Sequence, residues 1–367
     1  MRTIVHVIEG LIRGGAETLL TDLLPELKKH YSIVLVTLRP ENKFGDEIIK
    51  NCHGYYCLNY NGFPSFFSSI RKLKNIIRKH DPVLVRSQLT MSTIVARLAC
   101  PRNIPFVFSV HSTLSMQFKK DMKGRATRML QKTVPQKTDT MIGVSQVIVD
   151  DYKKHFHFNG STRVLYNYVR EEFFSGAASL PYDGGNLNLV AIGNLRMPKN
   201  YAYMIEAFRL LKGKPVHLDI YGDGPLHEQL QKQIDLYGLH ISLKGATTNS
   251  YHALRGYHAF VMVSSFEGFG IAVAEAMAAG MPLILSDIPV FREITGGNAF
   301  FVDLSSVNSF LSIIDELMSQ KIYLNSFLSE NNRIARDKYT REVYIKNLLS
   351  LYQEILNNKK SGMGALA

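Results

Sequence analysis

Short apolar runs alternate with amphipathic stretches along the whole chain. The run Ile4–Ile8 is apolar apart from His6, which predicts a buried strand, and leucines then recur on one face of Glu17–Lys29, as in a helix. Further strands are predicted at Ser32–Leu38, Val83–Ser87, Pro105–Val110 and Thr140–Val144, and helices at Ile70–His80 and Ser92–Leu98. This alternation predicts a mostly parallel sheet with helices on both faces.

The second half repeats the pattern. Strands are predicted at Asn188–Gly193, His217–Tyr221, Ile241–Lys244, Ala259–Val263 and Pro282–Leu285, and helices at Tyr201–Leu211, Leu226–Tyr237 and Ile271–Ala279. Ser175–Gly185 is rich in small residues, Pro and Asp, and indicates the linker that starts a second domain. We therefore expect two doubly wound α/β domains that bind ligands at the carboxyl ends of their strands.

Composition narrows the class of protein. The 367 residues suit two or three domains, and 46% hydrophobic with 20% charged residues is typical of a globular protein. The sequence has no run of 18 apolar residues and no recognisable signal peptide, so we expect a cytoplasmic protein, with peripheral attachment to the inner face of the cytoplasmic membrane left open. Cys52, Cys57 and Cys100 lack metal-ligand spacing and indicate free thiols or small buried hydrophobes.

The positive charge is confined to the first half of the chain. Residues 1–165 hold 25 Lys and Arg against 12 Asp and Glu, whereas residues 166–367 hold 18 against 19. Such asymmetry suggests an anionic partner for the first half, which could be nucleic acid, an anionic membrane or a phosphorylated substrate. A nucleic-acid partner is not expected, because no reading motif is present.

The strongest chemical signal follows the predicted strand Ala259–Val263. There, Glu267 precedes Gly268, Phe269 and Gly270, and a helix starts at Ile271 and carries Glu275. Glycines let a backbone approach a ligand closely, and the free amides of a helix start favour an anion such as a diphosphate. The alternative is an ordinary glycine turn with two unrelated glutamates.

This span resembles the retaining, nucleotide-sugar-dependent glycosyltransferases of family four, which have the GT-B fold and a Glu-x7-Glu motif. The match runs from Ser264 through Gly270 and from Glu275 to Pro282. Further matches occur in the family's order at Gly14-Gly15-Ala16-Glu17, His111, Val144-Ser145, Tyr166-Asn167, Gly222-Asp223-Gly224-Pro225 and Lys244-Gly245. The spacing of the two glutamates is weakly specific, but the ordered set is strongly so.

The resemblance implies a role for each matching residue. Glu267 would contact the donor sugar, Glu275 the ribose hydroxyls, and His111 would lie beneath the donor sugar. Gly14 and Gly15 would let the first loop approach the phosphates. The diphosphate would be held at the turn formed by Gly268, Phe269, Gly270 and Ile271. For His111 the alternative is a strand-end histidine in an ordinary hydrogen bond.

A second group of candidate residues, Gly193 to Asn200, follows the first strand of the second domain. Lys199 matches the lysine that family members use to neutralise the departing diphosphate. Many members have an arginine where this chain has Asn194, and Arg196, two residues later, is a candidate replacement. The alternative is a solvated loop. Other departures from the family are Asn167-Tyr168-Val169-Arg170, at the interdomain hinge, and Asp287-Ile288-Pro289, near the donor loop.

Two segments of the first half combine aromatic or apolar residues with cations. They are Phe66–Lys79 and Phe118–Met129. Basic amphipathic segments bind anionic lipid surfaces, so we expect the first domain to meet a membrane that carries the acceptor; a solvated helix face is the alternative.

The resemblance implies residues 1–168 as an acceptor-binding domain, 169–340 as a nucleotide-sugar-binding domain, 341–357 as a helix that crosses back to the first domain, and 358–367 as a disordered tail. It implies a retaining transferase that needs no metal or other cofactor, uses a nucleoside diphosphate sugar, preferably of UDP, and acts on a polyprenyl-diphosphate-linked glycan of surface polysaccharide. The alternatives are an enzyme that uses a GDP-sugar and a soluble acceptor, a sugar-phosphate epimerase of similar fold, and a catalytically silent membrane scaffold.

Overall fold

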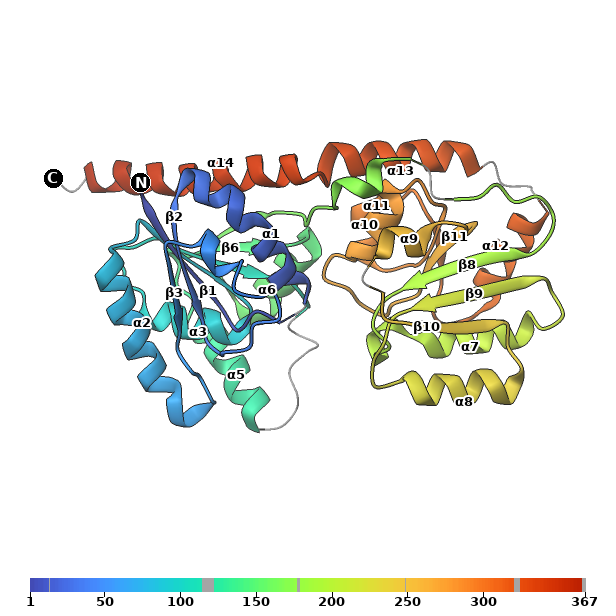
Figure 1. Cartoon of the computed structure of the whole chain (residues 1–367), viewed down its shortest axis with the longest axis horizontal. Coiled ribbons are helices and arrows are strands. Elements are labelled where there is room, and N and C mark those ends of the chain that lie inside the picture. The colour runs from blue at the N-terminus through green and yellow to red at the C-terminus, as the bar shows by residue number, and fades with distance from the viewer. Residues whose placement is uncertain (13, 114–121, 177–178, 248, 320–323, 365–367) are drawn as a thin grey trace. The chain divides into compact units, whose positions relative to one another are not determined.

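The computed structural model describes residues 1–12, 14–113, 122–176, 179–247, 249–319 and 324–364 (Figure 1). The chain divides into two compact units, Met1–Leu165 with Ile345–Ala367, and Tyr166–Tyr344. The stretch Ser175–Gly185, expected to be the linker that starts the second domain, belongs to the residue range of the second unit.

The first unit is built on a seven-stranded parallel sheet in the order β3-β2-β1-β4-β5-β6-β7. Its strands are β1 (Thr3–Ile8), β2 (Ser32–Thr37), β3 (Gly54–Cys57), β4 (Leu84–Gln88), β5 (Phe106–Val110), β6 (Thr140–Gly143) and β7 (Ser161–Val164). Strand order reverses between β1 and β4, and parallel sheets bind ligands at the carboxyl side of such a point.

Helices connect these strands and cover both faces of the sheet. They are α1 (Gly15–His30), α2 (Phe66–His80), α3 (Thr90–Ala99), α5 (Met122–Thr133) and α6 (Gln146–Phe156), with the last part of α14 (Arg341–Gly364). Ser87 of β4 reaches Thr93 of α3, whereas its neighbour Arg86 reaches Tyr352 of α14. Because neighbouring residues of a strand point to opposite faces, α3 and α14 cover opposite faces of the sheet.

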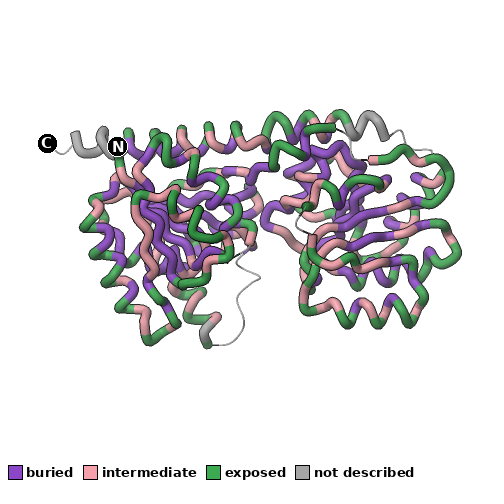
Figure 2. The backbone as a smooth tube through the Cα atoms, viewed as in Figure 1, coloured by how far each residue is buried: buried purple, intermediate pink, exposed green. Residues whose placement is uncertain are grey.

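Apolar burial explains why α1 docks on the sheet. Leu20, Leu23, Leu24 and Leu27 recur at helical spacing and are each at most 2% exposed. Full burial of one leucine stabilises the folded state by about 1.5–3 kcal/mol. Figure 2 shows the strands of this unit as largely buried.

The second unit is a six-stranded parallel sheet in the order β10-β9-β8-β11-β12-β13. Its strands are β8 (Leu187–Ile192), β9 (Val216–Tyr221), β10 (Ile241–Gly245), β11 (Ala259–Met262), β12 (Leu283–Ser286) and β13 (Phe300–Val302). Its helices are α7 (Tyr201–Leu210), α8 (His227–Tyr237), α9 (Ser250–Leu254), α10 (Ile271–Ala278), α11 (Pro289–Thr295), α12 (Asn308–Met318) and α13 (Leu324–Lys338). Here strand order reverses between β8 and β11, which defines a second ligand-binding edge.

Two doubly wound parallel sheets were predicted from the sequence and are confirmed. The strands that pattern analysis missed include β3 and β13, which lie at sheet edges and have four and three residues. The C-terminal helix was predicted to end at Asn357, with 358–367 disordered, but α14 continues to Gly364. The sequence after Asn357 contains no proline, and a glycine inside a helix costs only about 1 kcal/mol, so nothing ends the helix at that point.

Candidate active site

An ion pair joins the two loops at the switch point of the second unit. Lys199 Nζ lies 2.7 Å from Glu267 Oε1, and the Ser264 hydroxyl donates to the same oxygen at 2.9 Å. Lys199 ends the turn η4 (Met197–Lys199) after β8, whereas Glu267 follows β11, and the amide of Ser265 donates to Pro198 O at 2.8 Å. Two residues predicted as catalytic are thus brought together because their strands are neighbours.

The Lys199 side chain packs against Gly193. A Cβ atom at position 193 would lie 3.0 Å from Lys199 Cε, so the glycine lets the lysine pass. Tyr201, which the sequence analysis did not single out, donates its hydroxyl to Gly193 O at 3.0 Å. Burial, followed by the charge of Glu267, raises the pKa of Tyr201, so this phenol stays a hydrogen-bond donor.

The conformation of the turn before α10 depends on a glycine and on apolar packing. Gly270 has φ +83°, a left-handed conformation that disfavours other residues, and its position faces the Phe291 ring. Phe269 is buried, with its ring centroid 5.4 Å from that of Tyr339. The first amides of a helix have no intrahelical acceptor, so those at the start of α10 can bind an anion.

Glu275 lies one turn into α10, where it interacts with Arg170 and Ser250. Burial raises the pKa of this carboxyl to about 7, although the charge of Arg170 and a hydrogen bond with Ser250 act in the opposite direction. A carboxyl of this kind can accept hydrogen bonds from paired hydroxyls once it is ionised.

Asn194 and Arg196 are both exposed in the loop after β8. The amide of Arg196 donates to Asn194 O at 2.8 Å, which makes a tight turn. Within the described part of the chain, the Arg196 side chain has no hydrogen bond or ion pair to Lys199 or Glu267. A charge role for Arg196 therefore stays a prediction.

In the first unit, His111 lies directly after β5 at the edge of a cavity of about 200 Å³. Its Nε2 atom is buried and has no hydrogen-bond partner among the described residues. Burial, assisted by the charge of Arg86, lowers the pKa of His111 to about 4. The imidazole is therefore neutral at pH 7. The other polar residues that line the cavity are Glu9, Thr90, Thr93, Ser109, Ser112 and Gln131.

Gly14 and Gly15 begin α1, with Gly14 in the extended conformation of an N-cap. The Glu17 carboxylate folds back over Gly14, where a Cβ atom would clash with it. Burial raises the pKa of this carboxyl. The contact involves only the end of the flexible Glu17 side chain, and the approach of Gly14 to phosphate stays a prediction.

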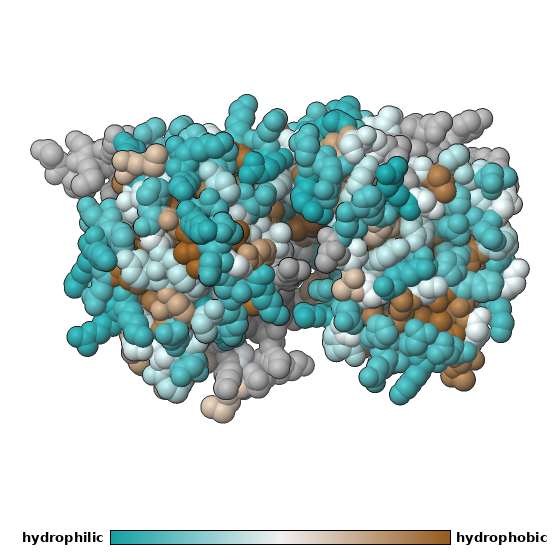
Figure 3. Space-filling view, in the orientation of Figure 1, coloured by the Kyte–Doolittle hydropathy of each residue, from teal (hydrophilic) through white to brown (hydrophobic). Residues whose placement is uncertain are grey.

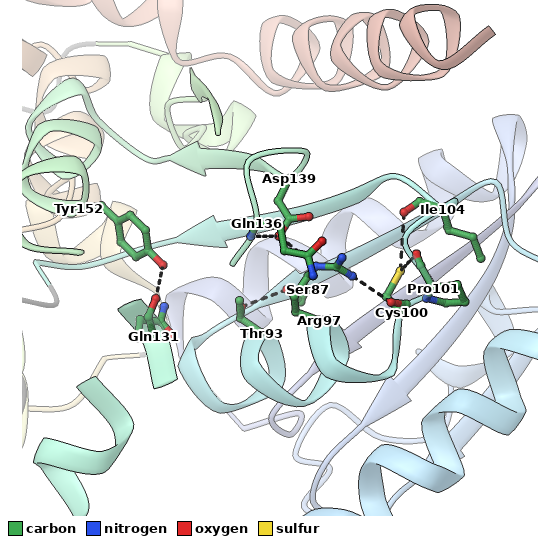
Figure 4. A network of polar contacts seen from close by, with 10 residues as sticks. All are labelled: Ser87, Thr93, Arg97, Cys100, Pro101, Ile104, Gln131, Gln136, Asp139 and Tyr152. Carbon is green, nitrogen blue, oxygen red and sulfur yellow. Dashed lines mark hydrogen bonds and ion pairs between the residues drawn. The ribbon is translucent and has the colours of Figure 1, made fainter. Parts of the chain in front are cut away.

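A polar network supports the cavity from the side of α3 and α6 (Figure 4). Arg97 and Asp139 form a buried ion pair at 3.1 Å, and the amide of Gln136 donates to Asp139 at 2.7 Å. The Tyr152 hydroxyl donates to Gln131 O at 3.3 Å, which ties α5 to α6. Burial raises the pKa of Asp139 to about 6, with Arg97 and the Gln136 amide acting against it.

The basic segment on α2 exposes aromatic side chains beside its cations. Phe67, on α2, is 71% exposed, and Arg71 and Lys74 of the same helix are exposed as well. Phe63, in the short turn Phe63–Ser65 before the helix, is 81% exposed, with its ring centroid 6.5 Å from that of Phe67. On α5, Met122 and Met129 are 86% and 68% exposed, whereas the start of that basic segment, 118–121, lies outside the described residues. The face shown in Figure 3 is largely hydrophilic, and its most extended hydrophobic group lies on the second unit.

The described residues contain no cluster of three or more His, Cys, Asp or Glu side chains placed to hold a metal ion. None of the described helices combines the length and apolar composition that crossing a membrane requires. All three cysteines are free thiols, with Cys100 buried and the others half-buried.

Comparison with known proteins identifies relatives of this chain and structures that share its fold. The chain is 24% identical over 351 residues to an uncharacterised glycosyltransferase of Methanocaldococcus jannaschii, covering 93% of this chain and 95% of that protein. It is 23% identical over 333 residues to the alpha-monoglucosyldiacylglycerol synthase of Acholeplasma laidlawii, covering 79% of each. The crystal structure of Anabaena HepE in complex with UDP shares the fold, with a TM-score of 0.80 and 17% identity over 96% of this chain and all of that one.

Two family models account for most of the chain. Residues 13–173 match Glycosyltransferase Family 4, and residues 178–335 match Glycosyl transferases group 1. These matches follow one another along the chain and each covers most of one sheet unit. The protein therefore belongs to the glycosyltransferases of the GT-B type.

Proposed function

We propose that this protein transfers a sugar from a nucleoside diphosphate sugar, preferably of UDP, to a lipid-linked glycan with retention of anomeric configuration. The observation that carries the proposal is the Lys199–Glu267 ion pair beside the start of α10. A cation, a carboxylate and free helix amides at one sheet edge suit a sugar joined to a diphosphate.

In the proposed reaction, the bond from the anomeric carbon to the diphosphate breaks and a bond to the acceptor oxygen forms on the same face. The acceptor hydroxyl proton leaves with the diphosphate. Lys199 and the α10 amides stabilise the charge that develops on the leaving group, and the exposed Arg196 supplies further positive charge. This set of cations and amides supports transfer without a bound metal.

Glu267 holds Lys199 in place before the donor binds and accepts hydrogen bonds from the donor sugar afterwards. Glu275 accepts the ribose hydroxyls, and His111 lies near the donor sugar as a neutral imidazole. The UDP preference is supported by the complex of HepE, whose fold this chain shares.

A membrane-linked acceptor is supported by the surface of α2. Exposed Phe67, Arg71 and Lys74 on this helix, with exposed Phe63 in the turn before it, are the apolar and basic groups that bind anionic lipid. The relative in Acholeplasma laidlawii is named for a glycosylated diacylglycerol, a membrane lipid. A surface-polysaccharide precursor is the glycan acceptor we propose.

A thermal-shift series with UDP, GDP and ADP, each alone and as a glucose conjugate, tests the donor. We expect UDP compounds to raise the melting temperature most, because ligand at 100 times Kd stabilises the folded state by about 2.7 kcal/mol. A larger rise in melting temperature with the GDP compounds would mean that the donor carries guanine instead of uracil. No rise with any nucleotide would contradict the proposed activity. The Lys199–Glu267 ion pair argues against a catalytically silent scaffold.

A further inference from the structure

The turn Gly222–Pro225, which follows β9, has no part in the proposed reaction, but it holds the neighbouring loop after β8. The Leu195 amide donates to Asp223 O at 3.1 Å, and the Leu226 amide donates to Leu195 O at 3.1 Å. The Leu195 side chain is fully buried in the core of the second unit. The turn and the core together thus fix the middle of the loop that leads to Lys199.

Two glycines of the turn let the loops approach this closely. A Cβ atom at position 224 would lie 2.6 Å from Leu195 O, and one at position 222 would lie 2.0 Å from Gly193 O. Both distances are shorter than an ordinary contact of a Cβ atom, and both neighbours are backbone atoms, which cannot swing aside as the end of a side chain does. An alanine at either position would therefore displace the backbone between Gly193 and Leu195.

Tyr201 of α7 holds the same loop from the interior of the unit. Its hydroxyl donates to Gly193 O at 3.0 Å, and the residue is 5% exposed. Tyr201, Lys199 and Met262 line one small internal space, in which Lys199 Nζ lies 3.8 Å from Met262 Sδ. The Gly193 carbonyl is thus held between the Tyr201 hydroxyl and Gly222.

The position of Lys199 depends on this loop in two ways. The Lys199 amide donates to Arg196 O at 3.0 Å, directly after the fixed residue Leu195. The Lys199 stem passes over Gly193, where a Cβ atom would lie 3.0 Å from Lys199 Cε. A shift of the 193–195 backbone would therefore move both the turn that carries Lys199 and the surface on which its side chain packs.

We propose that the Gly222–Pro225 turn and Tyr201 are positioning elements that hold the Lys199 ammonium where the leaving diphosphate needs it. The proposal rests on the proposed function, which gives Lys199 its role at the leaving group. A charge stabilises a transition state best when it is already in place, and a displacement of about 1 Å can cost about 100-fold in rate. The turn and Tyr201 act through Lys199 and require no contact with the donor.

The first test follows Lys199 itself, without any substrate. Carbon-13 dimethylation of the lysines makes them visible by NMR, and the peak that is missing in Lys199→Ala assigns the Lys199 signal. Tyr201→Phe removes the hydroxyl that binds Gly193 O, and Gly224→Ala adds the Cβ atom beside Leu195 O. We expect the Lys199 signal to move toward those of exposed lysines in both variants, because the ion pair with Glu267 is loosened.

The second test is a double-mutant cycle on turnover. Release of UDP from UDP-glucose, with water as acceptor, measures kcat for each variant alone and in the Lys199→Ala background. We expect Tyr201→Phe to lower kcat about fivefold, the scale of one hydrogen bond, and Gly224→Ala about 100-fold, with smaller changes in the Kd of UDP. In the Lys199→Ala background neither substitution should lower kcat further, because changes that act through one group are not additive.

Tyr203→Phe and Gly185→Ala are the matched controls. Tyr203 is a buried tyrosine of the same helix whose hydroxyl donates to Ser306 O at 3.1 Å, and Gly185 is exposed in a loop, where a Cβ atom would meet the Asp183 side chain. Both controls should keep the wild-type Lys199 signal and kcat. A similar fall in melting temperature in Tyr201→Phe and Tyr203→Phe would separate positioning from folding, and Tyr201→Phe serves alone if Gly224→Ala fails to fold.

The proposal is overturned if the Lys199 signal does not move in the variants, if kcat does not fall with it, or if the loss of kcat persists in full in the Lys199→Ala background. A wild type that releases no UDP, or whose kcat does not depend on Lys199, would instead contradict the proposed function. Movement of the Lys199 signal would still show in that case that the turn and Tyr201 set its position. The two failures are thus distinguishable.

Discussion

At the scale of single residues, Lys199 and Glu267 depend on one another. Each is largely shielded, with side-chain exposures of 20% and 17%, so neither charge is fully solvated without its partner. The pair gives the ligand-free site a defined geometry. In the proposed reaction, a donor diphosphate draws Lys199 from the carboxylate and leaves Glu267 available to the sugar.

Replacing Lys199 by Ala should slow sugar transfer by about 10²–10³-fold, because a cation that stabilises the leaving group acts mainly in the transition state. Steady-state kinetics should show the loss in kcat, with a smaller change in the affinity for UDP. Lys232→Ala, an exposed lysine on α8, is the control. Wild-type kcat in the Lys199 variant would refute the role.

The raised pKa of Glu275, about 7, makes a second residue-scale prediction. Between about pH 4.5 and pH 7, the Glu275 carboxyl is protonated in the folded protein but ionised in the unfolded chain. The contribution of Glu275 to the free energy of unfolding therefore falls as the pH rises through that window. The Glu275 carboxylate that we propose as acceptor for the ribose hydroxyls is the main form only above about pH 7.

UDP-glucose should therefore bind about tenfold more tightly at pH 8 than at pH 6, the change expected for a site that needs one group of pKa 7 ionised. Calorimetry at the two pH values measures this directly. In Glu275→Gln the affinity should be weaker and independent of pH. The same pH dependence in that variant would assign the titration to another group.

At the scale of elements, buried polar links decide where helices sit. The Arg97–Asp139 pair joins α3 to the start of β6, and the Tyr152 hydroxyl joins α6 to α5 (Figure 4). These links place the elements that line the cavity beside His111.

Arg97→Leu should lower the free energy of unfolding by about 3–5 kcal/mol, because it leaves the buried Asp139 carboxylate without its ion-pair partner and, within the described residues, with only the hydrogen bond from the Gln136 amide. The loss should be larger at pH 8 than at pH 5, where Asp139 can take up a proton. Urea denaturation at both pH values measures it. Adding Asp139→Asn should restore most of the stability, and failure to do so would mean that Arg97 stabilises through packing instead.

The α2 helix carries the element-scale prediction for membrane binding. Arg71→Glu with Lys74→Glu should reduce sedimentation with anionic vesicles, since each Lys or Arg near such a surface contributes about 1 kcal/mol. Lys72 is left in place because it donates to Leu58 O at 3.3 Å. The matched control reverses Lys153 and Lys154, two exposed charges on α6.

Binding of the wild type should also fall between 0.1 M and 1 M salt, as the Debye length shortens from about 10 Å to about 3 Å. UDP binding should be unchanged in both double variants. An equal loss of vesicle binding in the α2 and α6 variants would indicate an effect of net charge alone. If the wild type does not bind anionic vesicles, the proposed membrane binding is wrong.

At the scale of the whole molecule, charge is divided between the halves, and the two cations proposed to face the leaving group, Lys199 and Arg196, lie on the half without an excess of positive charge. The proposed neutralisation of the leaving group therefore relies on Lys199, Arg196 and oriented amides. Sugar transfer should accordingly survive saturating EDTA. Radiolabel transfer assays with and without the chelator measure this, and activity that is lost and returns with Mg²⁺ or Mn²⁺ would show that a metal takes this role.

Much of this molecule could be predicted from local patterns. Burial on two faces makes the strands β1 and β2 readable as mainly apolar runs, and leucines at helical spacing mark α1. The short edge strands β3 and β13 carry no such pattern. Lys199 and Glu267 could be found because they belong to motifs in the loops after strands, where parallel sheets place their ligands.

The sequence by itself determined two parallel-sheet units, their order and most groups of the proposed donor site, because periodicity and short motifs depend on residues close together in the chain. Only the tertiary structure decided that Lys199 meets Glu267, and that Glu9, His111 and Gln131 line one cavity. These residues come from different strands and helices, and their meeting depends on which strands are neighbours. That order is set by the packing of the whole sheet, which no local pattern contains.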